Sequence, residues 1–212
     1  MTSPDRTMSN LARLIAVMKI LRDPETGCAW DSAQSFETIA PYTIEEAYEV
    51  RDAIIRRDMA ALTDELGDLL LQVVFHSQIA ADQSLFDIGD VAAAIVDKME
   101  RRHPHIFGGS AAAGDWETIK AAERNRNATG HTSALAGIVS AMPALMVAEK
   151  LQKRAARTGF DWPDASGPRA KVIEEIAEVD GAATQIARTE EVGDLLFAVV
   201  NWARHLGIDP ES

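Results

Sequence analysis

The sequence predicts an all-α fold made of two similar helical units, and three observations support this prediction. Apolar residues recur at intervals of three and four along most of the chain, as they do on one face of a helix. The period-two alternation typical of β-strands is absent. An acidic pattern, Glu-Glu-x-x-Glu followed by Glu-x-x-Asp, occurs once in each half, beginning at Glu45 and at Glu174. We expect the helical hairpins that carry it to pack as four-helix bundles, within the chain or across a dimer.

The first helical unit is expected over residues 1–107, and helix start and stop signals divide it into four helices. Its helices are predicted from the N-cap Asn10 through Arg22, from a capping box of Thr43 and Glu46, over Met59–Asp82 after the N-cap Asp58, and from the N-cap Asp87 to just before Pro104.

The second helical unit is expected over residues 134–212, after a 108–133 linker that holds a short charged helix at 115–126. One helix should run from Pro143 to Thr158 with Gly159 as its terminator, and Pro168 should open the next. The last helix should end at His205, before Gly207. This copy ends without a counterpart of the fourth helix, so we expect it to be incomplete at its C-terminal side.

Helical geometry gathers the repeated carboxylates. Glu45, Glu46 and Glu49 share one face of a helix, and Glu65 and Asp68 share a face of the next helix. Glu49 precedes the intervening turn by about as many residues as Glu65 follows it, so the two groups should meet at one level of an antiparallel hairpin. In the second copy this hairpin is three residues shorter, a difference that can misplace Glu191 and Asp194.

Gathered carboxylates do not all stay ionised without a cation beside them. The alternative is that they form the wet side of amphipathic helices, but Glu65 lies on the same stripe as Leu62 and Leu69, and the segment 69–75 is apolar enough to be buried in a bundle. A ligand set made only of oxygen favours Mg²⁺, with Mn²⁺ as a substitute. Lys98 and Arg102, four residues apart, would then bind phosphate, although a helix C-terminus favours basic residues in any case.

Composition narrows the classes of partner. The net charge of −12 argues against a nucleic-acid polymer, and no apolar run is long enough to span a membrane. Cys28 is the single cysteine, and the first ten residues lack the apolar stretch of a secretory signal. We therefore expect a cytoplasmic protein.

Five motifs give the chain a strong resemblance to the tandem-domain form of the MazG family of nucleoside triphosphate pyrophosphohydrolases. The resemblance implies an all-α homodimer that uses Mg²⁺ to hydrolyse nucleoside triphosphates to the monophosphate and pyrophosphate. The motifs are Cys28-Ala29-Trp30-Asp31, the segment from Ile39 to Glu46, the segment from Glu65 to Leu70, the segment from Lys98 to His105, and Gly159-Phe160-Asp161-Trp162.

Matched position by position, the resemblance also implies roles for single residues. It makes Glu45 and Glu174 catalytic groups beside the attacking water or the nucleotide, and Lys98, Arg102 and Lys171 substrate-binding residues. It implies two sets of metal ligands, which are Glu46, Glu49, Glu65 and Asp68 in the first copy, and Glu175, Glu178, Glu191 and Asp194 in the second.

Two other functions stay open at the level of sequence. One is a narrower pyrophosphatase of the same helical superfamily, such as a dUTPase-like or phosphoribosyl-ATP-hydrolysing enzyme. The other is a catalytically weak helical adaptor in which the metal site is structural. Trp30 or Trp162 could stack on a nucleobase, although a tryptophan in the core is the commoner case.

Overall fold

The computed structural model describes residues 4–108, 123 and 133–212, and all regular secondary structure within these residues is helical, as expected. The chain divides into two compact units, Met1–Ile119 (unit 1) and Lys120–Ser212 (unit 2), each of which is described by itself. The expected short helix at 115–126 falls almost entirely outside the described residues, and so does most of the 108–133 linker.

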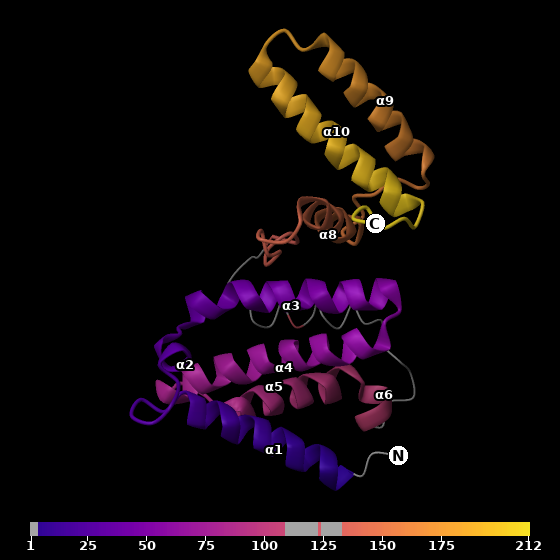
Figure 1. Cartoon of the computed structure of the whole chain (residues 1–212). Coiled ribbons are helices and arrows are strands. Elements are labelled where there is room, and N and C mark those ends of the chain that lie inside the picture. Colours follow the sequence, from indigo (N-terminus) through magenta and orange to yellow (C-terminus); the bar gives the residue numbers. More distant parts are fainter. Residues whose placement is uncertain (1–3, 109–122, 124–132) are drawn as a thin grey trace. The chain divides into compact units, whose positions relative to one another are not determined.

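Unit 1 is organised around an antiparallel pair of long helices, α3 and α4, and α4 also packs against α1 and α5 (Figure 1). A hydrophobic core forms where α1, α3 and α4 meet, with Met18, Ile39 and Ile79 almost fully buried. The helices of this unit are α1 (Pro4–Leu21), α2 (Ala29–Ala33), α3 (Phe36–Arg56), α4 (Met59–Asp82), α5 (Ile88–Arg102) and α6 (Pro104–Phe107).

Capping side chains fix where the hairpin helices start. Asp58 accepts hydrogen bonds from the amides of Ala60 and Ala61, which confirms it as the N-cap of α4. Asp87 is likewise confirmed as the N-cap of α5.

Two predicted helix starts are wrong. Helix α1 begins at Pro4, a residue whose fixed φ suits a first turn, and not after Asn10. Helix α3 begins after Ser35, which forms a capping box with Thr38, and so Thr43 and Glu46 lie inside the helix. Pro41, also inside α3, does not end it.

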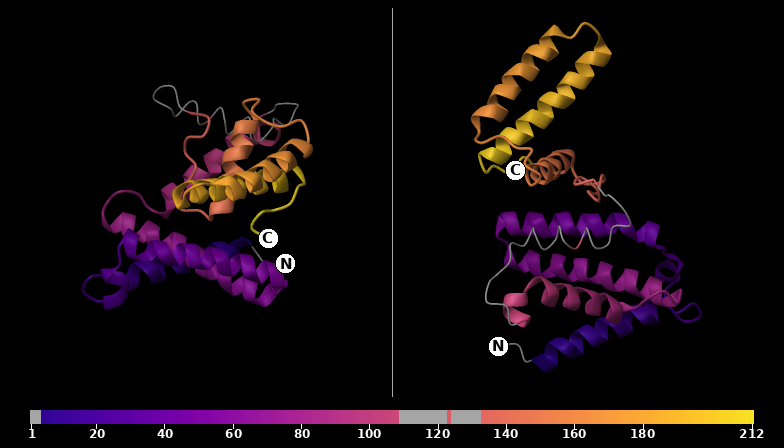
Figure 2. Two further views of the ribbon diagram at one scale, coloured as in Figure 1. Left: turned by 90° about the horizontal axis from the view of Figure 1, so that it is seen from above. Right: turned by 180° about the vertical axis from the view of Figure 1, so that it is seen from behind.

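Unit 2 repeats the hairpin as α9 (Ser166–Gly181) and α10 (Gln185–His205), with α8 (Ala144–Ala156) packed against α10 (Figure 2). The predicted terminators hold, because Gly159 and Gly207 adopt positive φ angles of 87° and 69° after the helices that they follow. Pro168 is the third residue of its helix, close to the predicted start.

Both hairpins leave an apolar stripe exposed. On α4 the stripe consists of Leu66, Leu70 and Val73, and each of these residues is 38–49% exposed. The expected burial of segment 69–75 is therefore confirmed only in part. The stripe of α10 consists of the residues at the matching positions, Val192, Leu196 and Val199.

Two further expectations bear on the surface of each unit. Trp30 and Trp162 are both about half exposed, so their assignment to the core was wrong. In the part of the chain that the structure describes, no helix is both long and apolar enough to cross a membrane.

Candidate metal centre

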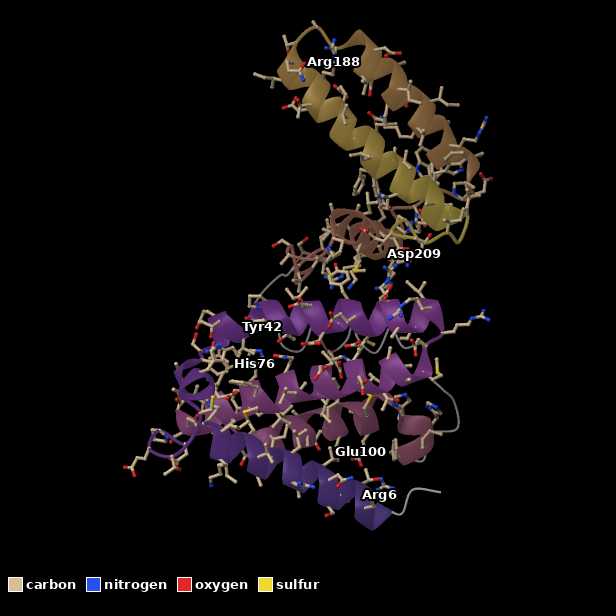
Figure 3. The ribbon with its side chains drawn as sticks, in the orientation of Figure 1. Arg6, Tyr42, His76, Glu100, Arg188 and Asp209 are labelled. Atoms are coloured by element: carbon tan, nitrogen blue, oxygen red, sulfur yellow. The ribbon has the colours of Figure 1, made fainter. Side chains whose placement is uncertain are left out.

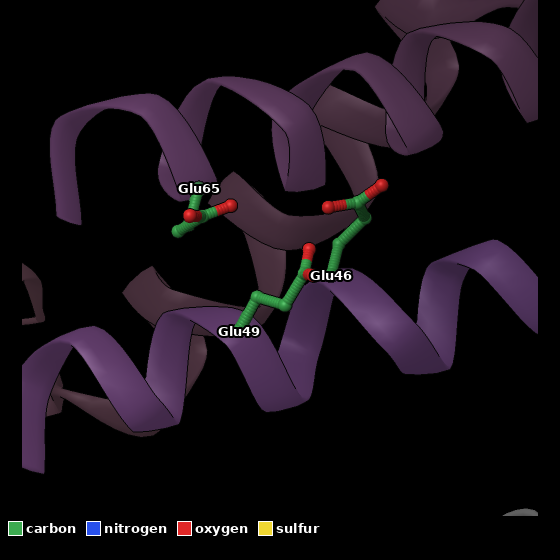
Figure 4. A group of neighbouring side chains, drawn as sticks. All are labelled: Glu46, Glu49 and Glu65. Atoms are coloured by element: carbon green, nitrogen blue, oxygen red, sulfur yellow. The ribbon is translucent and has the colours of Figure 1, made fainter. Parts of the chain in front are cut away.

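The hairpin of unit 1 brings together three glutamates that are distant in sequence. Glu46 and Glu49 on α3 and Glu65 on α4 each offer one carboxylate oxygen, and these three oxygens lie within 4.8 Å of one another. Figure 4 shows the three side chains pointing into the space between the two helices. Arg57, in the left-handed conformation at φ 56°, ends α3, and the tight turn that follows places the two acidic groups at the same level.

The environment of this trio resists its full ionisation. Burial raises the pKa of the Glu46 carboxyl, and a hydrogen bond with Glu49 and the charges of Asp68 and Glu49 raise it further. The pKa of Glu65 is also raised, by burial and then by the charges of Glu49 and Asp68. A cation between α3 and α4 would relieve both effects. Asp68 therefore acts on the trio electrostatically, although it is exposed and does not belong to it; Glu45 is exposed as well.

Unit 2 builds the same arrangement from Glu175, Glu178 and Glu191, again with one oxygen from each within 4.8 Å. The shorter hairpin does not separate Glu191 from its partners. Glu175 is only 3% exposed, and its Oε2 atom has no hydrogen-bond partner among the described residues. Burial raises the pKa of Glu178, and the charge of Glu175 adds to the effect. Asp194 is exposed and lies outside this trio.

Lys171 enters the acidic cluster of unit 2 directly. Its Nζ atom lies 2.6 Å from Glu175 Oε1 and 2.9 Å from Glu174 Oε1, and 4.0 Å from a carboxylate oxygen of Glu178. Bonds to Glu175 and Glu174 raise the pKa of Lys171 above its ordinary value. The second cluster therefore has a resident cation, whereas the matching residue of unit 1 is Tyr42, on α3 (Figure 3).

The expected phosphate-binding residues of unit 1, Lys98 and Arg102, lie on the last two turns of α5 and are half-buried. Helix α5 packs against α4 and runs antiparallel to it, so its C-terminal turns lie beside the half of α4 that carries Glu65 (Figures 1 and 2). The pair thus lies on a helix that packs against α4, but it does not belong to the trio.

The donor set fits a hard divalent cation. An octahedral Mg²⁺ ion with bonds of about 2.0–2.1 Å holds its ligand oxygens about 3–4 Å apart, so oxygens within 4.8 Å need only small side-chain movements to bind it. The unpartnered Oε2 of buried Glu175 is the kind of atom that an ion would satisfy. Among the described residues, neither trio includes histidine or cysteine, which a softer metal would favour.

Sequence reasoning missed two polar residues, Gln72 and His76, that lie on α4 beyond Glu65. His76 lies 3.0 Å from the Thr43 hydroxyl and stacks on Phe36, and burial lowers the pKa of His76. Gln72 is buried, and its Oε1 atom has no partner among the described residues. Helical spacing could have identified both, because residues 65, 72 and 76 fall on one face of α4.

Comparison with known proteins agrees with this helical acidic site. Residues 34–107, which contain the complete trio of unit 1, match the MazG nucleotide pyrophosphohydrolase domain. The chain is 51% identical to the nucleoside triphosphate pyrophosphohydrolase of Escherichia coli K12, over 96% of this chain and 81% of that protein. It is 44% identical to the MazG nucleoside triphosphate pyrophosphohydrolase/pyrophosphatase of Thermotoga maritima, over 94% of this chain and 77% of that protein.

Together with the helical fold and the acidic site, these matches define an all-α protein of the nucleotide pyrophosphohydrolase class. At this identity and coverage, the chain belongs to the MazG family of nucleoside triphosphate pyrophosphohydrolases.

Proposed function

We propose that this protein hydrolyses nucleoside triphosphates to nucleoside monophosphate and pyrophosphate with the help of Mg²⁺, for which Mn²⁺ can substitute. The observation that carries the proposal is the convergence of three glutamates from two facing helices, repeated in both units of a chain that belongs to this family. Such a site is suited to a substrate that supplies phosphate oxygens to the same ion.

In this proposal the two trios, each extended by the aspartate one turn further along, hold the ion: Glu46, Glu49, Glu65 and Asp68 in unit 1, and Glu175, Glu178, Glu191 and Asp194 in unit 2. When bound, a divalent ion neutralises charge on the phosphates and lowers the pKa of a water molecule. The two units act as tandem copies over residues 1–107 and 134–212.

The reaction forms a bond between a water oxygen and the α-phosphorus and breaks the bond from that phosphorus to the pyrophosphate oxygen. Glu45 in unit 1, or Glu174 in unit 2, accepts the proton of the attacking water. Lys98 and Arg102 bind the oxygens of the departing pyrophosphate, as basic side chains do in other phosphoryl transfers. Lys171 binds the phosphates of the nucleotide in unit 2.

We also propose that the protein acts as a homodimer. The apolar stripes of α4 and α10 lie at matching positions of the two hairpins, and each needs another helical surface to be covered. Pairing of hairpins from two copies would build a four-helix bundle around each acidic trio.

Pyrophosphate release from a panel of nucleoside triphosphates, measured with Mg²⁺ and with excess chelator, tests the function. We expect turnover of several nucleotides, and its loss when the ion is removed. Turnover of only one nucleotide would contradict the proposal and favour a pyrophosphatase with narrower substrate specificity. A protein that binds Mn²⁺ but releases no pyrophosphate from any of them would fit the structural adaptor.

A further inference from the structure

Lys171 lies inside the acidic cluster of unit 2, against the glutamates that would receive a divalent ion. Its Nζ atom is 2.6 Å from Glu175 Oε1 and 4.0 Å from Glu178 Oε2, two members of the trio, and 2.9 Å from Glu174 Oε1. Helical spacing explains the contacts, because Lys171 precedes Glu174 by three residues and Glu175 by four on α9. One ammonium group therefore lies against three carboxylates.

The lysine satisfies the buried glutamate of this cluster only in part. Glu175 is 3% exposed, and its Oε2 atom has no hydrogen-bond partner among the described residues. An ion held by the trio would satisfy this glutamate, but it would also approach the lysine. With a bond of about 2.0–2.1 Å to Glu175 Oε1, the ion would lie within about 5 Å of Lys171 Nζ. Two cations at that distance repel each other.

The lysine side chain is free to move out of the cluster. It is 40% exposed, and its flexible four-carbon stem ends in an ammonium group that water hydrates strongly. Solvent can therefore receive the Lys171 ammonium group when an ion takes its place. The same movement releases Glu174, the proposed proton acceptor of unit 2, from its ion pair.

The trio of unit 1 differs at the position that matches Lys171. Tyr42 occupies it and supplies no charge, and it is 42% exposed. Arg56, whose charge reaches Glu65, is paired with Asp52 at 2.7 Å. An ion that enters this trio therefore meets no ammonium group from the matching position of α3.

We propose that Lys171 is an internal counter-ion that a divalent ion displaces from Glu175, so that the lysine reaches the substrate phosphates only after the ion has entered unit 2. Unit 1 then binds its ion first, because no lysine opposes the ion at Tyr42. By linkage, a phosphate that pairs with the released ammonium group also favours ion binding in unit 2. The inference rests on the proposed function, because it concerns the same two ion sites and the same phosphates.

Acylation of lysine side chains, followed residue by residue by mass spectrometry, tests whether the ion displaces Lys171. Without nucleotide, saturating Mg²⁺ should raise the acylation rate of Lys171 about threefold or more, because the ion pairs no longer shield the amine. Glu191→Gln weakens the trio but keeps the glutamates that Lys171 contacts, so the increase should disappear in this variant. Lys153, paired with Glu149 at 2.6 Å on α8, is the internal control, and its rate should not respond to Mg²⁺.

Titration with Mn²⁺, with the free ion measured by electron paramagnetic resonance, compares the two units. We expect two classes of site in the wild type, the tighter lost in Glu46→Gln and the weaker lost in Glu175→Gln. Tyr42→Lys gives unit 1 the lysine of unit 2, and it should weaken the tighter class about fivefold or more. Tyr42→Met removes the phenol without adding a charge, so it should leave this class unchanged. Circular dichroism checks the fold of each variant.

Each result decides the proposal. An acylation rate of Lys171 that does not change with Mg²⁺ would mean that the ion binds beside the lysine, through Glu175 Oε2, and would overturn the displacement. Two sites of equal affinity, or unchanged Mn²⁺ binding by a folded Tyr42→Lys variant, would overturn the order of binding.

Pyrophosphate release tests the proposed function separately from the role of Lys171. A protein that releases pyrophosphate with Mg²⁺ while Lys171 stays protected would refute only this inference. Exposure of Lys171 by Mg²⁺, in a protein that hydrolyses no triphosphate, would support the displacement and refute the proposed function. Absence of Mn²⁺ binding would refute both.

Discussion

Lys171 shows how one side chain can make two copies of an acidic site differ. In unit 2 its ammonium group bonds to Glu174 and Glu175, so this cluster is partly neutralised without any ion. In unit 1 the matching position holds Tyr42, which supplies no charge. The buried Glu175 makes the difference important, because a buried carboxylate needs either this lysine or a metal ion.

Lys171→Met should therefore increase the response of unit 2 to a divalent ion. Without metal we expect the variant to melt at a lower temperature than the wild type, because Glu175 loses its partner. Mn²⁺ should then raise the melting temperature more in the variant, with a severalfold tighter apparent affinity, since the ion no longer competes with an ammonium group. The measurement is thermal unfolding against Mn²⁺ concentration, in a Glu46→Gln background that weakens the unit 1 site.

Lys153→Met is the matched control, because Lys153 pairs with Glu149 on α8 at 2.6 Å, away from the trio. It should leave the Mn²⁺ response as it is in the background protein. An unchanged Mn²⁺ response in Lys171→Met would show that Lys171 does not compete with the ion.

Asp161 predicts a pH dependence for the stability of unit 2. Hydrogen bonds from Arg204, joined by His205 and the Trp162 amide, lower the pKa of Asp161 to about 2 from an ordinary value of 3.8. Because the folded protein holds the proton more weakly than the unfolded chain, the ionised carboxylate stabilises the fold above about pH 4. This stabilisation is lost as the pH falls through 4 toward 2.

Asp161→Asn should consequently lower the free energy of unfolding by about 1–2 kcal/mol at pH 7, a range reduced for partial exposure of the pair. The difference from the wild type should shrink toward zero near pH 2. Urea denaturation at several pH values, followed by Trp fluorescence, measures it. Asp180→Asn, an exposed change elsewhere on α9, should show no such trend, and a pH-independent effect of Asp161→Asn would argue against the ion pair.

A third experiment at this scale assigns the chemistry to the two trios. We expect the double variant Glu46→Gln, Glu175→Gln to lose pyrophosphate release by at least a hundredfold while circular dichroism shows unchanged helicity, because both ion sites are weakened together. The single variants Glu46→Gln and Glu175→Gln then show which unit is active. If one of them keeps full turnover, the trio that it changes does not carry out the hydrolysis. Full turnover by the double variant would refute the role of both trios.

At the scale of the element, two helix starts, those of α4 and α5, were predicted correctly. Asp58 and Asp87 were recognised because an aspartate directly precedes a helical pattern. The start of α3 was missed because Thr43 and Glu46 have the spacing of a capping box, whereas Ser35 and Thr38 cap the helix about two turns earlier. Convergence of the two acidic groups followed from helical periodicity and hairpin geometry alone.

Other parts of the candidate site depend on tertiary packing, which periodicity does not encode. The family resemblance implied four carboxylates for each ion, whereas the structure brings three together and leaves the aspartate exposed one turn away. The burial of Gln152 and the exposure of Trp162 likewise depend on how α8, α9 and α10 pack. The contact of Lys171 with Glu175, in contrast, joins residues four apart on α9, so helical spacing could have identified it.

The turn between α3 and α4 offers a test of the hairpin itself. Arg57 has φ 56°, a left-handed conformation that glycine adopts without the steric cost borne by other residues. Arg57→Gly should therefore stabilise the hairpin by up to about 1 kcal/mol. Arg51→Gly, in the middle of α3, should destabilise it by about 1 kcal/mol. Hydrogen exchange of the α3 and α4 amides measures both, and destabilisation by Arg57→Gly would contradict the strained turn.

At the scale of the whole molecule, each of the two units has an exposed apolar stripe on its hairpin, on α4 in unit 1 and on α10 in unit 2. The stripe of Leu66, Leu70 and Val73 on α4 recurs 126 residues later on α10, as the acidic residues of the same helices do. A repeat that preserves both the charged and the apolar positions of a helix is best explained if both faces contact something. The charged face is suited to an ion, and the apolar face to another hairpin.

The dimer proposal predicts that a charge placed in these stripes separates the copies. The wild type should have a mass of about 46 kDa in light scattering coupled to size-exclusion chromatography, twice the chain mass of 23.0 kDa. Leu70→Glu with Leu196→Glu should shift it toward 23.0 kDa, because burying an unpaired carboxylate in a helical interface is costly. Leu85→Glu, at an exposed leucine outside both stripes, should remain dimeric. A wild type with the mass of one chain, or a double variant that stays dimeric, would mean that the stripes are covered in some other way.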